Sequence, residues 1–232
     1  MTILASAIIT RAQTIVQDST GVRWPFSEML QWLNDGQREV AIYKPSATAV
    51  NVALTLTQGT LQNLGAGGLA LLRVMRNLKT PVTTPRVGTR ATRMVDREVL
   101  DSQHPSWHDP SVFPYAKEVK HFCFDDTDPT NFYVFPGNDG TGAVEVVMSR
   151  SPIDVVSVGD PNTLTSYNQP ISIPDIYSNV LLDYVLFRAY SKDADFAGNA
   201  DRSATHYTLF AGSLAAKAQN EAVVNPNVRT KA

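Results

Sequence analysis

Apolar side chains recur every three or four positions near both ends of the chain, a spacing that places them on one face of a helix. Two such runs occupy residues 2–18 and 25–43. Pro25 suits the first turn of the second helix, and Pro45 ends it. Because only a short turn around Gly21 separates the two runs, they predict an antiparallel helical hairpin.

Helical spacing returns in the last third of the chain. Pro174 and Asp175 are suited to open one long helix, and a further helix is expected from about residue 199 to residue 220. Each pair of helices would bury one apolar stripe against the other pair. The simplest assembly is therefore an antiparallel helical bundle built from both chain ends, residues 1–45 and 171–221.

Between these helices the apolar side chains recur about every second position, as they do in β-strands. Residues 47–57 alternate β-branched and small side chains, and residues 69–77 form a short apolar run that fits either a strand or a helix. Three aromatic and β-branched runs, joined by turn-rich linkers, occupy residues 120–126, 131–137 and 142–152. We expect these three runs to form an antiparallel meander within a β domain inserted at residues 46–170.

The fold class that follows is α+β. It comprises an antiparallel helical bundle formed by both chain ends, an inserted antiparallel β domain and an extended C-terminal arm at residues 222–232. The arm is expected because EAVVNPNVRTKA, residues 221–232, has neither helical periodicity nor enough apolar side chains to fold by itself.

Composition narrows the class of protein. The 232 residues are 43% apolar, and no apolar run approaches the roughly 20 residues that a membrane-spanning helix needs. Polar residues interrupt the N-terminal apolar stretch, which does not read as a signal peptide. The single cysteine, Cys123, excludes an intramolecular disulfide and fits a reducing compartment. Secreted mini-protein, membrane, collagen-like and disordered classes are excluded, which leaves a soluble intracellular or capsid-type protein.

Charge is sparse and unevenly placed. Charged residues are 18% of the chain, and the net charge of -2 argues against a dedicated nucleic-acid binder. Residues 45–115 hold 7 basic and 4 acidic residues, whereas residues 120–201 hold 4 basic and 12 acidic ones. Unlike regions of this kind suit head-to-tail self-association, in which opposite charges meet on neighbouring copies. Solvated loops with no such role are the alternative.

The sequence contains few residues whose pattern suits catalysis, and we expect no catalytic, cofactor-binding or metal-binding residue. The glycine-rich residues 63–73 lack both nucleotide-binding fingerprints, and no serine lies in a GxSxG motif. The residues whose side chains suit zinc are His104, His108, His121 and Cys123. Pro105 breaks the helical spacing of the first two, so a hydrogen-bonded loop histidine and a buried free thiol are favoured over a metal site.

Arginines gather between residues 73 and 97. Because no exposed aromatic residues are interleaved with them and no nucleic-acid motif is present, we interpret them as ion-pair partners for another subunit or as solvated side chains. The basic patch expected to contact another subunit comprises Arg86, Arg90, Arg93 and Arg97.

Four long stretches, in this order along the chain, resemble a known family. They are TGVRWPFSEMLQWLNDGQREVAIYKP (20–45), RATRMVDREVLDSQHPSWH (90–108), HFCFDDTDPTNFYVFPG (121–137) and IYSNVLLDYVLFRAYSKDADFAGNADRSATHYTLF (176–210). Together they resemble the head-to-tail adaptor, or connector, proteins of short-tailed bacteriophages, a family akin to tail tubular protein A.

This resemblance implies a non-enzymatic virion protein, assembled in the host cytoplasm and located at the head-tail junction. It implies a ring of twelve copies that joins the portal protein to the tail nozzle protein and lines the channel for passing double-stranded DNA, with no cofactor and no membrane partner. The arm residues expected to order on the portal are Val223, Val224, Asn225, Pro226 and Asn227. Another head- or tail-completion protein, or a zinc-binding module built on the histidine-cysteine set, is the alternative.

Overall fold

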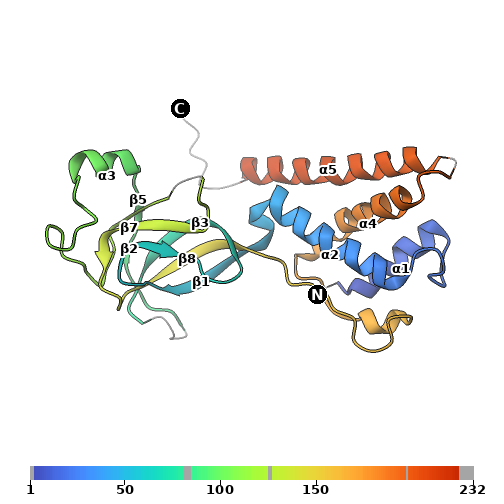
Figure 1. Cartoon of the computed structure of the whole chain (residues 1–232), viewed down its shortest axis with the longest axis horizontal. Helices are drawn as coiled ribbons and strands as arrows, with labels where there is room; N and C mark the ends of the chain where they lie inside the picture. The colour runs from blue at the N-terminus through green and yellow to red at the C-terminus, as the bar shows by residue number, and fades with distance from the viewer. Residues whose placement is uncertain (1–2, 81–84, 125–126, 197, 225–232) are drawn as a thin grey trace. The chain divides into compact units, whose positions relative to one another are not determined.

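The computed structural model describes residues 3–80, 85–124, 127–196 and 198–224. Two compact units divide the chain: Met1–Ala47 together with Pro152–Ala232 form one, and Thr48–Ser151 form the other. Helices make up the first unit and strands dominate the second (Figure 1). The α+β class predicted from the change in period is confirmed.

All four helices predicted from the apolar spacing are present in the helical unit. They are α1 (Ala5–Val16), α2 (Phe26–Tyr43), α4 (Ser178–Lys192) and α5 (Asn199–Val224). One core draws on every one of them, since Ile8, Leu33, Leu181 and Phe210 have no exposed surface. Helix α4 packs against α1, α2 and α5. The 3-10 helices of the chain are η1 (Pro45–Thr48), η2 (Leu164–Tyr167) and η3 (Asp175–Tyr177).

Helices α2 and α4 approach closely at Gly36. A Cβ atom at this position would lie 3.0 Å from Tyr184 Cδ1 and 3.2 Å from Leu181 Cδ2. Any larger side chain would force these two buried residues to shift. Glycine therefore allows the two helices to pack against each other here despite its low helix propensity.

Two buried amides on α2 fix the segment that returns from the β unit. Asn34 Nδ2 donates to the Val155 carbonyl at 2.9 Å, and Val155 N donates to Asn34 Oδ1 at 3.0 Å. Gln37 Oε1 accepts from Ser172 N at 2.8 Å. The chain from Pro152 onwards consequently belongs to the helical unit. The sequence predicts this return only at residue 171, because the intervening segment carries no helical pattern.

The β unit contains two four-stranded sheets among its described residues. In spatial order, one sheet is β1 (Ala49–Thr55), β8 (Ala143–Arg150), β3 (Gly68–Leu78) and β4 (Gly88–Ala91). The other is β2 (Gly59–Asn63), β7 (Asn131–Asn138), β6 (His121–Cys123) and β5 (Arg93–Met94). Neighbouring strands are antiparallel except β5 and β6, which are parallel. A short helix, α3 (Arg97–Gln103), follows β5.

The expected three-stranded meander is wrong at its last strand. Strands β6 and β7 pair as predicted, but β8 pairs with β1 and β3 in the other sheet. Seven of the eight β8 side chains are buried or half-buried, which suits a strand with neighbours on both edges. The apolar run at residues 69–77, left open between strand and helix, is the long strand β3. The turn after β7 thus marks a reversal of the chain without determining which strand pairs next.

The predicted arm cannot begin at residue 222, because α5 continues to Val224. Its last turns are rich in alanine, the residue with the highest helix propensity, and this offsets their lack of apolar periodicity. Of the arm residues proposed to meet the portal, Val223 and Val224 are helical in backbone, while Asn225, Pro226 and Asn227 lie outside the described residues.

Candidate functional site

The four arginines predicted to form one basic patch fall into two groups. Arg86 and Arg97 are held within their own unit. Arg86 Nη1 donates to Asn51 Oδ1 at 2.7 Å and lies 3.4 Å from Glu145 Oε1. Arg97 Nε lies 3.5 Å from Asp101 Oδ2. These two side chains already have partners and are less suited to meet another subunit.

Glu145 explains why Arg86 is engaged. Its carboxylate rises from the central strand β8 with only 11% of the side chain exposed, and Arg76 Nε donates to it at 2.6 Å. The hydrogen bond from Arg76 lowers the pKa of Glu145, so the carboxylate stays ionised at neutral pH. Arg86 contacts the same carboxylate and also the backbone oxygen of Asn51, so it covers part of the open edge of β1.

Arg90 and Arg93 form the second group. Both are exposed, and no carboxylate in the described part of the chain lies within ion-pair distance of either guanidinium. Lys120 joins them, because the parallel pairing of β5 with β6 places its backbone oxygen 3.1 Å from Arg93 N. We call Arg90, Arg93 and Lys120 the cation cluster. Lys120 is not part of the patch predicted from the sequence, because it lies far along the chain from the arginine-rich region.

His121 lies among these three cations. Burial lowers the pKa of His121, and the charges of Arg90, Arg93 and Lys120 lower it further. The imidazole is therefore neutral at pH 7 and adds no charge. Its ring stacks on Phe135 with the centroids 6.4 Å apart. The cation cluster thus presents three positive charges that no described carboxylate balances.

Asn77 sets the position of the cation cluster. It is 1% exposed, and its Nδ2 donates to the Arg90 carbonyl at 2.9 Å and to the Val119 carbonyl at 2.8 Å. Val119 N in turn donates to Asn77 Oδ1 at 2.9 Å. One buried amide on β3 thereby fixes both β4 and the segment that leads into β6.

The histidine-cysteine set is packed rather than arranged around a metal. His104 stacks on Phe135 with the centroids 5.5 Å apart, and His108 Nδ1 lies 2.8 Å from Thr60 Oγ1. Burial raises the pKa of the Cys123 thiol to about 11, which keeps it protonated and a poor ligand. Within the described residues, no three His, Cys, Asp or Glu side chains are grouped so that they could hold a metal ion.

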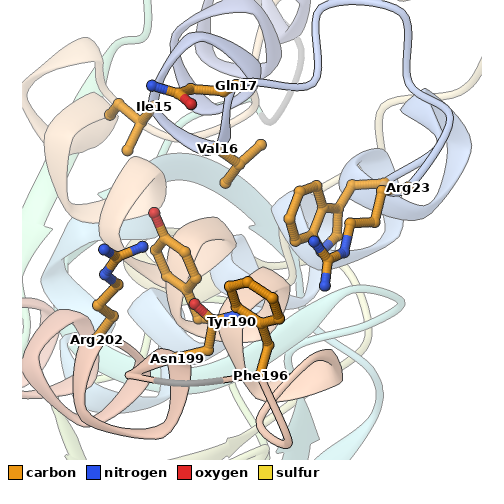
Figure 2. Close-up of a pocket in the computed structure, with 9 residues that line it drawn as sticks. Ile15, Val16, Gln17, Arg23, Tyr190, Phe196, Asn199 and Arg202 are labelled. Atoms are coloured by element: carbon orange, nitrogen blue, oxygen red, sulfur yellow. The ribbon is translucent and has the colours of Figure 1, made fainter.

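A recessed site of a different kind lies in the helical unit (Figure 2). It is a pocket of about 410 Å³ between the end of α1, the turn before α2, the end of α4 and the start of α5. Side chains that shape it include Val16, Arg23, Trp24, Tyr190, Phe196 and Arg202. No motif in the sequence indicates this pocket, because each contributing segment supplies only one to three residues.

The two arginines of the pocket differ in their partners. The Arg23 guanidinium lies 4.9 Å from the ring centroid of Trp24 and 5.3 Å from that of Phe196, and it forms an ion pair with Asp193. The Arg202 guanidinium lies 5.7 Å from the ring centroid of Tyr190. It has no ion-pair partner among the residues that the structure describes. The pocket therefore holds one neutralised arginine and one unpaired arginine.

Comparison with known protein families shows to which family the chain belongs. The model of the SU10 adaptor protein family matches residues 3–230. The chain belongs to the SU10 adaptor protein family. A search of curated proteins gives no match. The match confirms the broader part of the resemblance found in the sequence: this adaptor is a structural protein of a bacteriophage, from a family that is not one of enzymes.

An ion pair anchors the end of the last described helix of the adaptor. Lys44, 4% exposed, places Nζ 2.5 Å from Glu221 Oε1, and Ser46 Oγ donates to Glu221 Oε2 at 2.9 Å. Burial acts to lower the pKa of Lys44, but hydrogen bonds with Glu221 and Tyr177 outweigh it and the pKa is raised. Glu221, near the end of α5, is therefore held beside Lys44 and Ser46.

No helix in the described part of the adaptor combines the length with the apolar character that crossing a lipid bilayer requires. The family match places the protein in the virion.

Proposed function

We propose that this adaptor is a head-to-tail adaptor of a short-tailed bacteriophage, akin to tail tubular protein A. In this role twelve copies form a ring between the portal protein and the tail nozzle protein, and double-stranded DNA passes through its centre. The observation that carries the proposal is the family match over residues 3–230. The four resembling stretches, which follow one another in order along the chain, support the finer assignment.

Electron microscopy of the adaptor mixed with the portal protein of the same genome tests this function. End-on views of the complex are expected to show a twelvefold ring of adaptor against the portal. A chain that forms its own ring without touching the portal, or that binds a tail protein only, would instead belong to another head- or tail-completion protein.

A ring of identical chains needs two different surfaces on each copy that fit one another. The cation cluster is suited to be one of them, because its three charges have no acidic partner within the described chain. Exposed carboxylates of the helical unit, such as Asp160 and Asp195, supply the opposite charge. We propose that the cation cluster of one copy meets acidic side chains of the next, with Arg86 and Arg97 as the flanking members of the patch.

Reversing the charge of the cation cluster tests this contact. The double variant Arg90→Glu, Arg93→Glu should weaken ring assembly at least about tenfold, because unlike charges become like charges. Its fold should be unchanged, since neither side chain has an ion-pair partner within the described chain. The measurement is the concentration dependence of sedimentation at low and high salt. Arg73→Glu, an exposed arginine on β3, is the matched control. A double variant that assembles like the native protein would show that the cluster plays no part.

We propose that the portal-binding arm comprises the end of α5 from Val223 and the residues that follow it, with Val223, Val224, Asn225, Pro226 and Asn227 as the contacts. The ion pair of Glu221 with Lys44 supports this proposal, because it holds the root of the arm in a defined place. Apolar residues next to a proline suit a segment that orders on its partner.

Removing residues 223–232 should lower the affinity for portal at least about 100-fold, the effect of losing the main anchors of an interface. The fold should survive, because Leu214 contributes the last buried side chain of α5 within the described residues. Affinity is measured by light scattering or sedimentation, and the fold by circular dichroism and Tm. A chain that ends at residue 227 retains all five contacts and is the control. Native affinity of the longer deletion would exclude the arm from the portal contact.

A further inference from the structure

Neither the ring nor the arm accounts for the pocket in the helical unit. Tyr190 closes part of it, and only 6% of this residue is exposed. Figure 2 shows the Tyr190 hydroxyl pointing into the pocket, towards the space between Arg202 and the end of α1. No hydrogen bond joins this hydroxyl to any residue in the described part of the chain. The hydroxyl keeps access to solvent, since it is not among the buried unpartnered polar atoms of the described residues, and it is free to donate to a ligand atom in the pocket.

Arg202 provides the second set of donors. Its guanidinium lies beside the Tyr190 ring, and no described carboxylate neutralises it. Arg23 cannot serve in the same way, because Asp193 already occupies its guanidinium. One free guanidinium together with one hydroxyl matches a singly charged group with two acceptor oxygens. That group is a carboxylate, which arginine binds through two parallel hydrogen bonds.

The rest of the lining is mixed. Gln17 and Asn199 are polar, whereas Val16, Trp24 and Phe196 supply apolar surface, and Phe196 is 60% exposed. A phenylalanine this exposed beside a pocket suits contact with another large apolar side chain. The volume of about 410 Å³ lies at the lower end of the range for ligand sites, enough for one or two amino-acid residues.

We propose that this pocket binds a peptide segment of another virion protein in which a carboxylate lies next to a bulky apolar side chain. The carboxylate accepts hydrogen bonds from Arg202 and from the Tyr190 hydroxyl, and the apolar side chain packs against Trp24 and Phe196. That the peptide comes from a virion protein rests on the proposed function. The preference for a carboxylate beside an apolar group rests on the pocket alone.

N-acetyl-L-phenylalanine is a probe with this chemistry, and N-acetyl-L-phenylalaninamide is its neutral counterpart. Titration of the full chain, followed through the NMR signal of the Trp24 indole, should show the acid binding at least about fivefold more tightly than the amide. Arg202→Gln should reduce the affinity for the acid to that for the amide. Tyr190→Phe keeps the ring and should weaken binding of the acid only. Arg188→Gln, an exposed arginine outside the pocket lining, is the matched control and should bind as the native chain does.

Three results would overturn the proposal: no binding of either probe, equal affinity for the acid and the amide, or an affinity for the acid that Arg202→Gln leaves unchanged. Because the titration contains no portal protein, its outcome is independent of ring formation. A chain that forms the ring but does not bind the acid would contradict only the proposal about the pocket. A chain that binds the acid but does not bind the portal would contradict only the proposed function.

Discussion

Asn77→Leu is expected to lower the free energy of unfolding of the β unit by about 2 to 6 kcal/mol, because each of the two buried backbone groups of Val119 left unsatisfied costs about 1 to 3 kcal/mol. Leucine has a similar size but cannot replace the bonds to the Arg90 carbonyl and to both backbone groups of Val119. Val119 is fully buried, so its two backbone groups cannot turn to solvent. The variant should also assemble into the ring less well, because the same amide positions the cation cluster.

Urea denaturation followed by Trp107 fluorescence measures this effect, because Trp107 is fully buried in the β unit while Trp24 and Trp32 lie in the helical unit. The matched control is Asn63→Leu, since Asn63 is exposed on β2. The control should cost less than about 1 kcal/mol. An Asn77→Leu variant as stable as this control would show that the buried amide does not organise β3, β4 and β6.

Asn34→Leu should destabilise the helical unit by about 2 to 5 kcal/mol, because it leaves two buried backbone groups of Val155 without partners. Leucine on α2 would also meet the polar Gln37 side chain, which now donates to Asn34 Oδ1 at 3.2 Å. The segment that begins at Pro152 would lose its attachment to α2. Opening of this segment should therefore precede global unfolding.

Hydrogen exchange followed by mass spectrometry reports on the attachment directly. The Val155 amide is protected in the native protein and should exchange at least about tenfold faster in Asn34→Leu, in line with the cost of one lost buried bond. Asn179→Leu, an exposed asparagine on α4, is the control and should leave exchange at Val155 unchanged. Native exchange in the Asn34 variant would mean that other contacts hold the segment.

Local features of this fold were open to prediction from the sequence. The helices follow from apolar spacing that each segment carries by itself, and proline positions mark the start of α2 and the turn before α4. The alternating run at residues 47–57 contains β1 for the same reason. Such patterns depend on neighbours along the chain, so a single sequence is enough to reveal them.

Features that depend on distant partners were not open to prediction. The place of β8 between β1 and β3 depends on pairing across the chain, and a turn signal says nothing of it. The segment from Pro152 is attached by single amides of Asn34 and Gln37, which leave no periodic trace. Lys120 joins the cation cluster only through the parallel pairing of β5 with β6. The Tyr190–Arg202 pocket likewise unites segments that show no motif separately.

Polar groups therefore connect the segments of this adaptor, and they also supply its candidate contacts with other proteins. Buried amides such as Asn34 and Asn77 connect segments far apart in sequence, and they bring unpaired charges to defined places on the surface. Within the described chain, neither the cation cluster nor Arg202 has an acidic partner. Both are therefore suited to partners outside the chain, as expected of a protein that joins others.

Co-sedimentation with the portal protein of the same genome tests the central claim most directly. Twelve copies of 25.4 kDa would add about 305 kDa to the portal ring. The account predicts a complex heavier than portal by this amount, formed from adaptor that sediments as a small species alone. A portal that sediments unchanged in the presence of excess adaptor would contradict the assignment as a head-to-tail adaptor.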